Sequence, residues 1–84
     1  MKKKICIVGL GYIGLPTATM FSCYGHKVIG VDVNEKVVNN INKGKIIIEE
    51  PNLEELVEDV VKKGNLIASI SPKESDVFII SVPT

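Results

Sequence analysis

The chain has 84 residues, of which 45% are hydrophobic and 24% charged, and its ten lysines are balanced by ten acidic residues. This length limits it to one domain at most, and the composition is ordinary for a folded globular protein. The zero net charge excludes a strong field for nucleic acid or an anionic membrane surface, and no apolar run approaches the roughly 20 residues that span a bilayer.

The first predicted element is a buried strand over residues 4–8, because the run after Lys4 is continuously apolar instead of alternating. It leads into Gly9-Leu10-Gly11-Tyr12-Ile13-Gly14, a Gly-x-Gly-x-x-Gly pattern that opens a segment with helical spacing. In such a loop the first glycine permits a tight turn, the second lets a pyrophosphate approach the backbone, and the third lets helix and strand pack closely. A glycine triplet alone is a weak signal, but this strand-to-helix context indicates a dinucleotide site.

The helix that follows the glycine loop is predicted to end at Gly25. Pro16 is tolerated in its first turn, where the N–H groups have no partners within the helix. Its expected buried face consists of Ile13, Thr17, Met20, Phe21 and Tyr24. Cys6, in the first strand, and Cys23, late in this helix, are expected to be two buried thiols in a reducing cytoplasm. No signal peptide is visible, which also favours the cytoplasm.

A second apolar strand over residues 27–33 contains Asp32, close to the ~20-residue offset after Gly14 at which a carboxylate binds a ribose hydroxyl. A carboxylate at that position repels a 2′-phosphate, and the chain has no arginine to offset the repulsion. We therefore expect NAD in preference to NADP. Lys36 is interpreted as a solvated lysine.

Asn34 is expected to cap a second helix that ends at Gly44 and has an apolar face of Val37, Val38 and Ile41. Residues 45–50 are predicted to be an irregular connection with a short extended part, because consecutive isoleucines favour extended structure.

Asn52 and Glu55 resemble a capping box, which predicts a third helix that ends at Gly64. Its amphipathic stripe consists of Leu53, Leu56, Val57, Val60 and Val61. Two further strands are predicted over residues 66–70 and 76–82, with a turn between them.

Strands that alternate with helices predict an α/β fold with a parallel sheet and right-handed crossovers. The expected fold is the first half of a Rossmann domain, a doubly wound parallel sheet, with strand order 3-2-1-4. Ligands bind such sheets beyond the carboxyl ends of the strands, at the switch point between the first and fourth strands. The glycine loop, Asp32 and residues 82–84 are expected to converge there.

Five blocks of this sequence resemble the N-terminal segment of the UDP-glucose/UDP-N-acetylmannosamine dehydrogenase family, in matching order and spacing over essentially the whole chain. They are Gly-Leu-Gly-Tyr-Ile-Gly-Leu-Pro at 9–16, Val-Ile-Gly-Val-Asp-Val-Asn at 28–34, Ile-Asn-Lys-Gly at 41–44, Glu-Pro-Asn-Leu at 50–53 and Ser-Val-Pro-Thr at 81–84. Residues 45–51 resemble the branch that acts on UDP-N-acetyl-D-mannosamine more than the branch that acts on UDP-glucose.

The resemblance implies an NAD-dependent enzyme that oxidises the C6 alcohol of a UDP-sugar to a carboxylate and consumes two NAD. The family's cysteine nucleophile lies far downstream, so residues 1–84 are expected to be a partial NAD-binding domain with no catalytic residue and no metal site. The central helical and C-terminal UDP-sugar domains would lie outside them. The resemblance further implies a homo-oligomeric parent protein in polysaccharide biosynthesis.

Carried over residue by residue, the resemblance assigns seven cofactor-binding residues: Gly9, Gly11, Tyr12, Ile13, Gly14, Asp32 and Thr84. Asp32 is expected to take the adenosine ribose hydroxyls, and Thr84 to lie near the cofactor at the end of the last strand. The alternatives are that Tyr12 only packs over the loop, that Thr84 has no ligand role, and that Asp32 only caps a helix.

Two alternatives for the function remain open at this point. One is a UDP-glucose 6-dehydrogenase, and the other is a non-catalytic NAD-sensing Rossmann module. Leu15-Pro16 and Glu50-Pro51 favour the dehydrogenases, because sensing domains do not usually show them. Flavin- or S-adenosylmethionine-binding folds rank lower.

Overall fold

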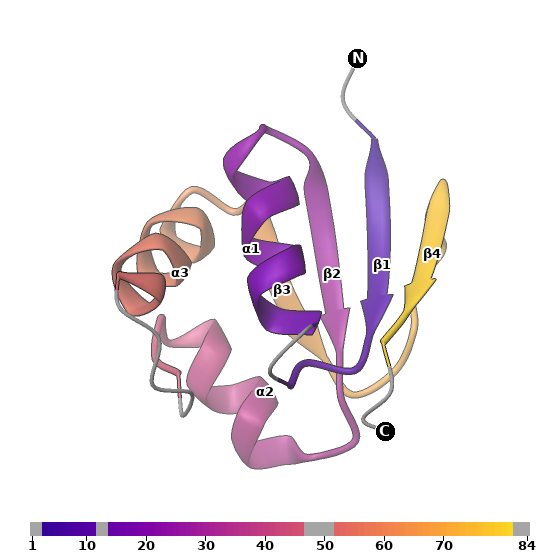
Figure 1. Ribbon diagram of the computed structural model, residues 1–84. Helices are drawn as coiled ribbons and strands as arrows, with labels where there is room; N and C mark the ends of the chain where they lie inside the picture. The colour runs from indigo at the N-terminus through magenta and orange to yellow at the C-terminus, as the bar shows by residue number, and fades with distance from the viewer. Residues whose placement is uncertain (1–2, 12–13, 47–51, 82–84) are drawn as a thin grey trace.

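The computed structural model describes residues 3–11, 14–46 and 52–81. Within these ranges the strands form one parallel sheet in the order β3-β2-β1-β4, which confirms the predicted topology (Figure 1). The elements in chain order are β1 (Lys4–Val8), α1 (Gly14–Cys23), β2 (Lys27–Val31), α2 (Glu35–Asn42), α3 (Leu53–Lys62), β3 (Leu66–Ser69) and β4 (Val77–Ile80).

The register of the sheet brings the carboxyl ends of its strands to one edge. Val8, the last residue of β1, is aligned with Val31 of β2 on one side and with Ile80 of β4 on the other. Val31 is in turn aligned with Ser69 at the end of β3. The segments that follow the strands therefore start side by side along that edge, as the arrowheads in Figure 1 show.

The three helices of the described residues pack against one face of the sheet. Alternate strand residues point to opposite faces, so only every second strand residue contacts the helices. Ile5, Ile7 and Val28 join residues of α1, α2 and α3 in the main core cluster. Their neighbours Cys6 and Ile29 form a second, smaller cluster on the other face. The helical residues of the main cluster are Leu15, Ala18, Val37, Val38, Ile41, Leu53, Val57 and Val60.

The predicted buried face of α1 is wrong for Met20 and Tyr24, whereas Phe21 packs against the main core cluster and Ile13 lies outside the described residues. Met20 and Tyr24 are 52% and 75% exposed, whereas Gly14, Ala18 and Ser22, spaced by four, are buried. Small residues let the helix approach its neighbours closely, and the buried Ser22 hydroxyl donates to the Ala18 carbonyl oxygen at 2.8 Å. Apolar residues occur all around this helix, so their spacing could not identify the packed face.

The prediction of two buried thiols holds for Cys6 and fails for Cys23, which is exposed. Ser22 takes the buried position at the end of α1. Cys23 is turned by about 100° from it around the helix axis, so its side chain leaves the core.

The two other helices differ in how their N-termini are capped. Asn34 caps α2 as predicted, because its side chain accepts from the Lys36 backbone N–H at 3.0 Å. The capping box predicted at Asn52 is wrong, since this residue is left-handed, with φ of 67°, and makes no side-chain cap bond. A side-chain cap needs an extended backbone at that position. In α3, Leu56 of the predicted stripe is 46% exposed, while the buried members are Leu53, Val57 and Val60.

The predicted strand over residues 27–33 ends earlier, at Val31, and the one over residues 66–70 ends at Ser69. Val33 and Ile70, expected in these strands, lie beyond the sheet and are exposed. Most of the connection predicted over residues 45–50 lies outside the described residues, because residues 47–51 are not described. Val82, the last residue of the predicted strand over residues 76–82, also lies outside them.

The outer edge of β3 is covered by a side chain instead of another strand. Asn42, at the end of α2, donates to the Ala68 carbonyl oxygen at 3.0 Å and accepts from the Ala68 N–H at 2.8 Å. These bonds satisfy backbone groups that an edge strand otherwise presents to other chains.

Replacing Asn42 with alanine is expected to lower the free energy of unfolding by about 1–2 kcal/mol, because two hydrogen bonds to backbone are lost. Urea unfolding measures the change. The matched control is Asn39→Ala, at an exposed position of the same helix, which should stay within about 0.5 kcal/mol of the parent. Equal losses from the two variants would contradict the role of Asn42.

Candidate dinucleotide-binding site

The turn after β1 is tight enough to require glycine at its first position. Gly9 has φ of 101°, and its N–H donates to the Val31 carbonyl oxygen at 2.7 Å. A Cβ at Gly9 would overlap the carbonyl oxygen of Ser81. Ser81 is itself held by its N–H, which donates to the Val8 carbonyl oxygen at 2.8 Å. The loop therefore starts in a narrow space between the ends of β2 and β4.

Gly14 and Gly11 have opposite surroundings. Gly14 is the first residue of α1, and a Cβ there would overlap the Gly9 carbonyl oxygen, so the helix begins directly against the loop. Gly11 is exposed, and nothing lies within 4 Å of the position that its Cβ would take. The backbone at Gly11 is therefore open to a close ligand. These surroundings fit the roles expected of the three glycines around a pyrophosphate.

Asp32 connects the end of β2 to the glycine loop. One carboxylate oxygen, Oδ2, accepts from the Leu10 N–H at 3.0 Å, and Oδ1 accepts from the Asn34 N–H at 2.9 Å. An ionised carboxylate offers about four acceptor positions, so two remain for ligand hydroxyls. The side-chain cap of α2 comes from Asn34. Asp32 is thus held in a fixed orientation beside the loop with acceptor capacity to spare.

Leu10 fixes the position of the loop over the sheet, a role that the sequence reasoning missed. Its side chain is 3% exposed, and its Cδ2 lies 2.6 Å from the position that a Cβ at Gly30 would take. Gly30 therefore leaves the notch on β2 that Leu10 occupies. A glycine inside an apolar strand is the available sequence signal, because it often marks such a close approach.

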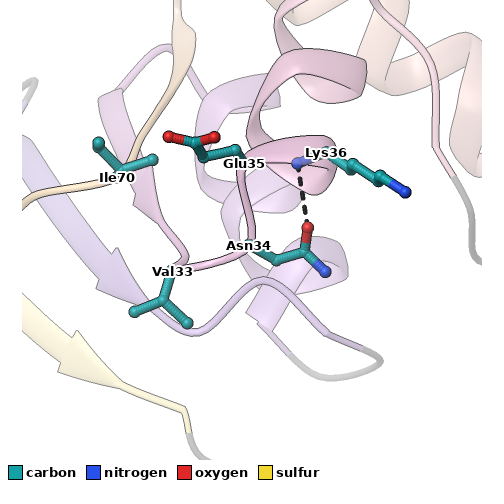
Figure 2. A pocket seen from close by; sticks show the side chains of 5 residues that line it. All are labelled: Val33, Asn34, Glu35, Lys36 and Ile70. Atoms are coloured by element: carbon teal, nitrogen blue, oxygen red, sulfur yellow. Dashed lines mark hydrogen bonds between the residues drawn. The ribbon is translucent and has the colours of Figure 1, made fainter.

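An open depression of about 700 Å³ lies beside Asp32. Figure 2 shows the five side chains that line it: Val33, Asn34, Glu35, Lys36 and Ile70. Val33 and Ile70 follow two strand ends that are joined by a bond from the Asp32 N–H to the Ser69 carbonyl oxygen, at 3.1 Å. They are 92% and 54% exposed, and exposed apolar side chains in a concave site are typical of ligand-binding grooves.

The structure brings together four of the residues predicted for the site: Gly9, Gly11, Gly14 and Asp32. Tyr12, Ile13 and Thr84 lie outside the described residues, as do residues 82–84 as a whole, and their cofactor contacts stay predictions. The tertiary structure adds Leu10 and Gly30, which position the loop, and it shows that Val33, Glu35 and Ile70 line the neighbouring depression.

Within residues 3–11, 14–46 and 52–81, none of the helices has the length and apolar character to cross a membrane. Nor do His, Cys, Asp or Glu side chains in these ranges gather in groups of three or more that could hold a metal ion.

A glycine-rich turn from β1 into α1, a carboxylate at the end of β2 and the parallel order β3-β2-β1-β4 define a Rossmann-type dinucleotide-binding domain. The family model for the NAD-binding domain of the UDP-glucose/GDP-mannose dehydrogenase family matches residues 3–84. The chain belongs to this family, and its cofactor is NAD.

Similar proteins include the UDP-N-acetyl-D-mannosamine dehydrogenase of Methanococcus maripaludis strain C7, 56% identical over 98% of this chain and 19% of its own length. The Campylobacter jejuni protein of that name is 58% identical over 96% of this chain and 20% of its own length. A solved UDP-N-acetyl-mannosamine dehydrogenase structure from Staphylococcus aureus has a TM-score of 0.92 and 51% identity, over 95% of this chain and 19% of that one. The chain therefore spans about a fifth of the length of these relatives.

Proposed function

We propose that the chain is the cofactor-binding N-terminal part of an NAD-dependent UDP-sugar 6-dehydrogenase. The proposed reaction converts UDP-N-acetyl-D-mannosamine to UDP-N-acetyl-D-mannosaminuronate. The sugar is inferred from relatives at 56% and 58% identity that carry the name UDP-N-acetyl-D-mannosamine dehydrogenase. The single observation that carries the NAD site is the position of the Asp32 carboxylate, 3.0 Å from the Leu10 N–H of the glycine loop.

In this proposal the backbone beside Gly11 and the N-terminus of α1 bind the pyrophosphate of NAD. An anion is favoured there because the first N–H groups of a helix have no partners within it and the helix dipole is positive at that end. The free acceptor positions of Asp32 take the adenosine ribose hydroxyls. Tyr12, Ile13 and Thr84 are proposed as further contacts. Bound NAD supplies the acceptor for a hydride from the sugar alcohol.

Neither cysteine of this chain suits the family's nucleophile. Cys6 is fully buried inside β1. Cys23 is the last residue of α1, whereas the glycine loop adjoins the first residue of that helix. We therefore propose that the nucleophile and the UDP-sugar site belong to central helical and C-terminal domains of the complete protein, with residues 1–84 as a partial NAD-binding domain.

The exposed side chains of β4 support a larger domain. Phe78 and Ile80 are 55% and 73% exposed on the side of the sheet away from the helices. A fully apolar strand is typical of positions that are covered on both faces, so we propose that further parts of the same protein pack on β4. From the family resemblance we also propose a homo-oligomeric protein in polysaccharide biosynthesis. From its two free cysteines we propose a location in the reducing cytoplasm.

The test uses the native polypeptide that carries this sequence, after its intact mass has been measured. It is supplied with NAD and, separately, UDP-N-acetyl-D-mannosamine, UDP-glucose or GDP-mannose, and NADH formation is followed by absorbance. We expect two NADH for each UDP-N-acetyl-D-mannosamine, and no turnover by residues 1–84 alone. Preferred turnover of UDP-glucose would support the UDP-glucose alternative, and NAD binding with no turnover of any sugar would support the sensing module.

Replacing Asp32 with asparagine is expected to weaken NAD binding about tenfold and to reduce the preference for NAD over NADP. The amide has one acceptor oxygen, while two backbone N–H groups and the ribose hydroxyls compete for it. Its neutral charge also removes the repulsion of a 2′-phosphate. Calorimetric titration with each dinucleotide measures both quantities.

The control for this variant is Asp76→Asn. Asp76 accepts from the Lys4 N–H at 2.9 Å, a bond between carboxylate and backbone at the opposite end of β1. The Asp76→Asn variant should leave the affinities for NAD and NADP unchanged. If the two variants changed those affinities equally, Asp32 would have no special role at the cofactor.

A further inference from the structure

The glycine loop is fastened to three consecutive residues at the end of β2. The Gly9 N–H donates to the Val31 carbonyl oxygen at 2.7 Å, and the Leu10 N–H donates to the Asp32 carboxylate at 3.0 Å. The Leu10 side chain lies against Gly30, where an added Cβ would come within 2.6 Å and 2.9 Å of its two methyl carbons. Gly30 and Asp32 are two residues apart, as expected for two points on the same side of an extended chain. Leu10 is therefore held at neighbouring points, once by its side chain and once by its N–H.

The contact between Leu10 and Gly30 leaves no room for a larger residue on the strand. Leu10 is 3% exposed and belongs to the main core cluster, and the cavity that it lines measures only about 10 Å³. Because such an interior is close-packed, added bulk at Gly30 has to push the Leu10 side chain outward. That movement pulls the Leu10 N–H away from Asp32 and shifts Gly11, the next residue, whose open backbone is the proposed position of the pyrophosphate.

We infer that Leu10 and Gly30 form a volume-matched pair of positioning residues, in which the sum of the two side-chain volumes sets the position of the glycine loop over β2 and thereby the affinity for NAD. This inference rests on the proposed NAD site. Neither side chain has to touch the cofactor. The bond from Leu10 orients the Asp32 carboxylate for the ribose and fixes the backbone that leads to Gly11, and hydrogen bonds weaken steeply when their geometry is lost.

The test moves side-chain volume from the loop to the strand. Gly30→Val is expected to weaken NAD binding at least about tenfold, because the bond between Leu10 and the charged Asp32 is lost. Valine suits a strand, so the loss does not come from strand propensity. When Leu10→Ala is added, the pair again has as many side-chain carbon atoms as leucine and glycine together. The double variant should bind NAD within about threefold of the parent affinity, since the two changes compensate.

Amide hydrogen exchange at Leu10 provides a second readout that does not require the cofactor. Calorimetric titration of the native polypeptide measures the NAD affinity, and mass spectrometry of the peptide that contains Leu10 follows the exchange. Exchange should be at least about tenfold faster in Gly30→Val, because the Leu10 N–H loses its acceptor on Asp32. It should return to the parent rate in the double variant.

The matched control is Val28→Ile, which also adds volume at a buried position of β2 that faces the helices, but further from the loop. This control should lower the stability and leave both the NAD affinity and the exchange at Leu10 unchanged. If Gly30→Val does not fold, Gly30→Ala gives the same comparison, because its Cβ alone already meets Leu10.

Parent affinity in Gly30→Val would overturn the inference, and so would a double variant that binds NAD no better than Gly30→Val. A loss of affinity without faster exchange at Leu10 would also overturn it. If the parent protein bound no NAD, the proposed NAD site would fail. The exchange rates of the single and double variants would then decide by themselves whether Leu10 and Gly30 act as a pair.

Discussion

Replacing Gly11 with valine is expected to weaken NAD binding by at least about a hundredfold without unfolding the protein. Two lost hydrogen bonds from backbone N–H groups to a charged phosphate, at about 1.5–3 kcal/mol each, account for that factor. The side chain would occupy the open space beside the loop, where nothing now lies within 4 Å of the position of a Cβ. The pyrophosphate of NAD needs the same space to reach the backbone.

The expected tolerance of the fold separates this variant from an ordinary destabilised mutant. Gly11 is exposed and lacks the left-handed backbone of Gly9, so a Cβ there meets no neighbouring atom within 4 Å and no strain of that kind. Calorimetric titration measures the affinity, and thermal unfolding followed by circular dichroism measures the stability. Gly11→Ala should show a smaller loss of affinity in the same direction. Full NAD affinity in Gly11→Val would show that the pyrophosphate binds elsewhere.

Replacing Gly9 with alanine is expected to have the largest effect on stability, a loss of more than about 3 kcal/mol. Alanine at this position meets two costs at once. The backbone has φ of 101°, outside the range that L side chains readily adopt, and the new Cβ would overlap the Ser81 carbonyl oxygen. A domain of this size has a total stability of about 4–12 kcal/mol, so the loss is a large share of it.

Two other glycines separate these costs. Gly64 has φ of 79° with nothing within 4 Å, so Gly64→Ala should lose about 1 kcal/mol from backbone strain alone. Gly14 has no positive φ, but its Cβ would overlap the Gly9 carbonyl oxygen, so Gly14→Ala carries the overlap without that strain. Urea unfolding should rank the losses with Gly9→Ala largest and Gly64→Ala smallest. An equal loss at Gly9 and Gly64 would mean that the loop moves freely away from Ser81.

The sequence predicted the topology well because its signals are local and repeated. Uninterrupted apolar runs marked β1 and β4, the glycines and Asn34 marked helix ends, and alternation of strands with helices implied the parallel order that the structure confirms. The glycine loop and Asp32 could be singled out because the pyrophosphate and the ribose each demand a particular residue type at a set spacing.

The prediction failed where the choice of face or partner depends on distant residues. Met20 on α1 and Tyr24 just after it looked suited to the core but are exposed, because small residues of the helix face its neighbours. Asparagine is a residue type suited to an N-cap, but the left-handed backbone of Asn52 prevents its side chain from capping α3. Strand propensity placed Val33 and Ile70 in the sheet, whereas both strands end before them.

The sequence by itself determined the order of the elements and the class of ligand, because these follow from short patterns. The charge of Asp32 predicts the preference for NAD over NADP. Only the tertiary structure decided what holds the site together. The bond from Leu10 to Asp32, the notch at Gly30 and the depression between Val33 and Ile70 join segments that lie far apart along the chain. Such contacts arise from the register of the parallel strands, which brings the carboxyl ends of the strands to one edge of the sheet. This register depends on pairing between distant segments, so no single segment of the sequence reveals it.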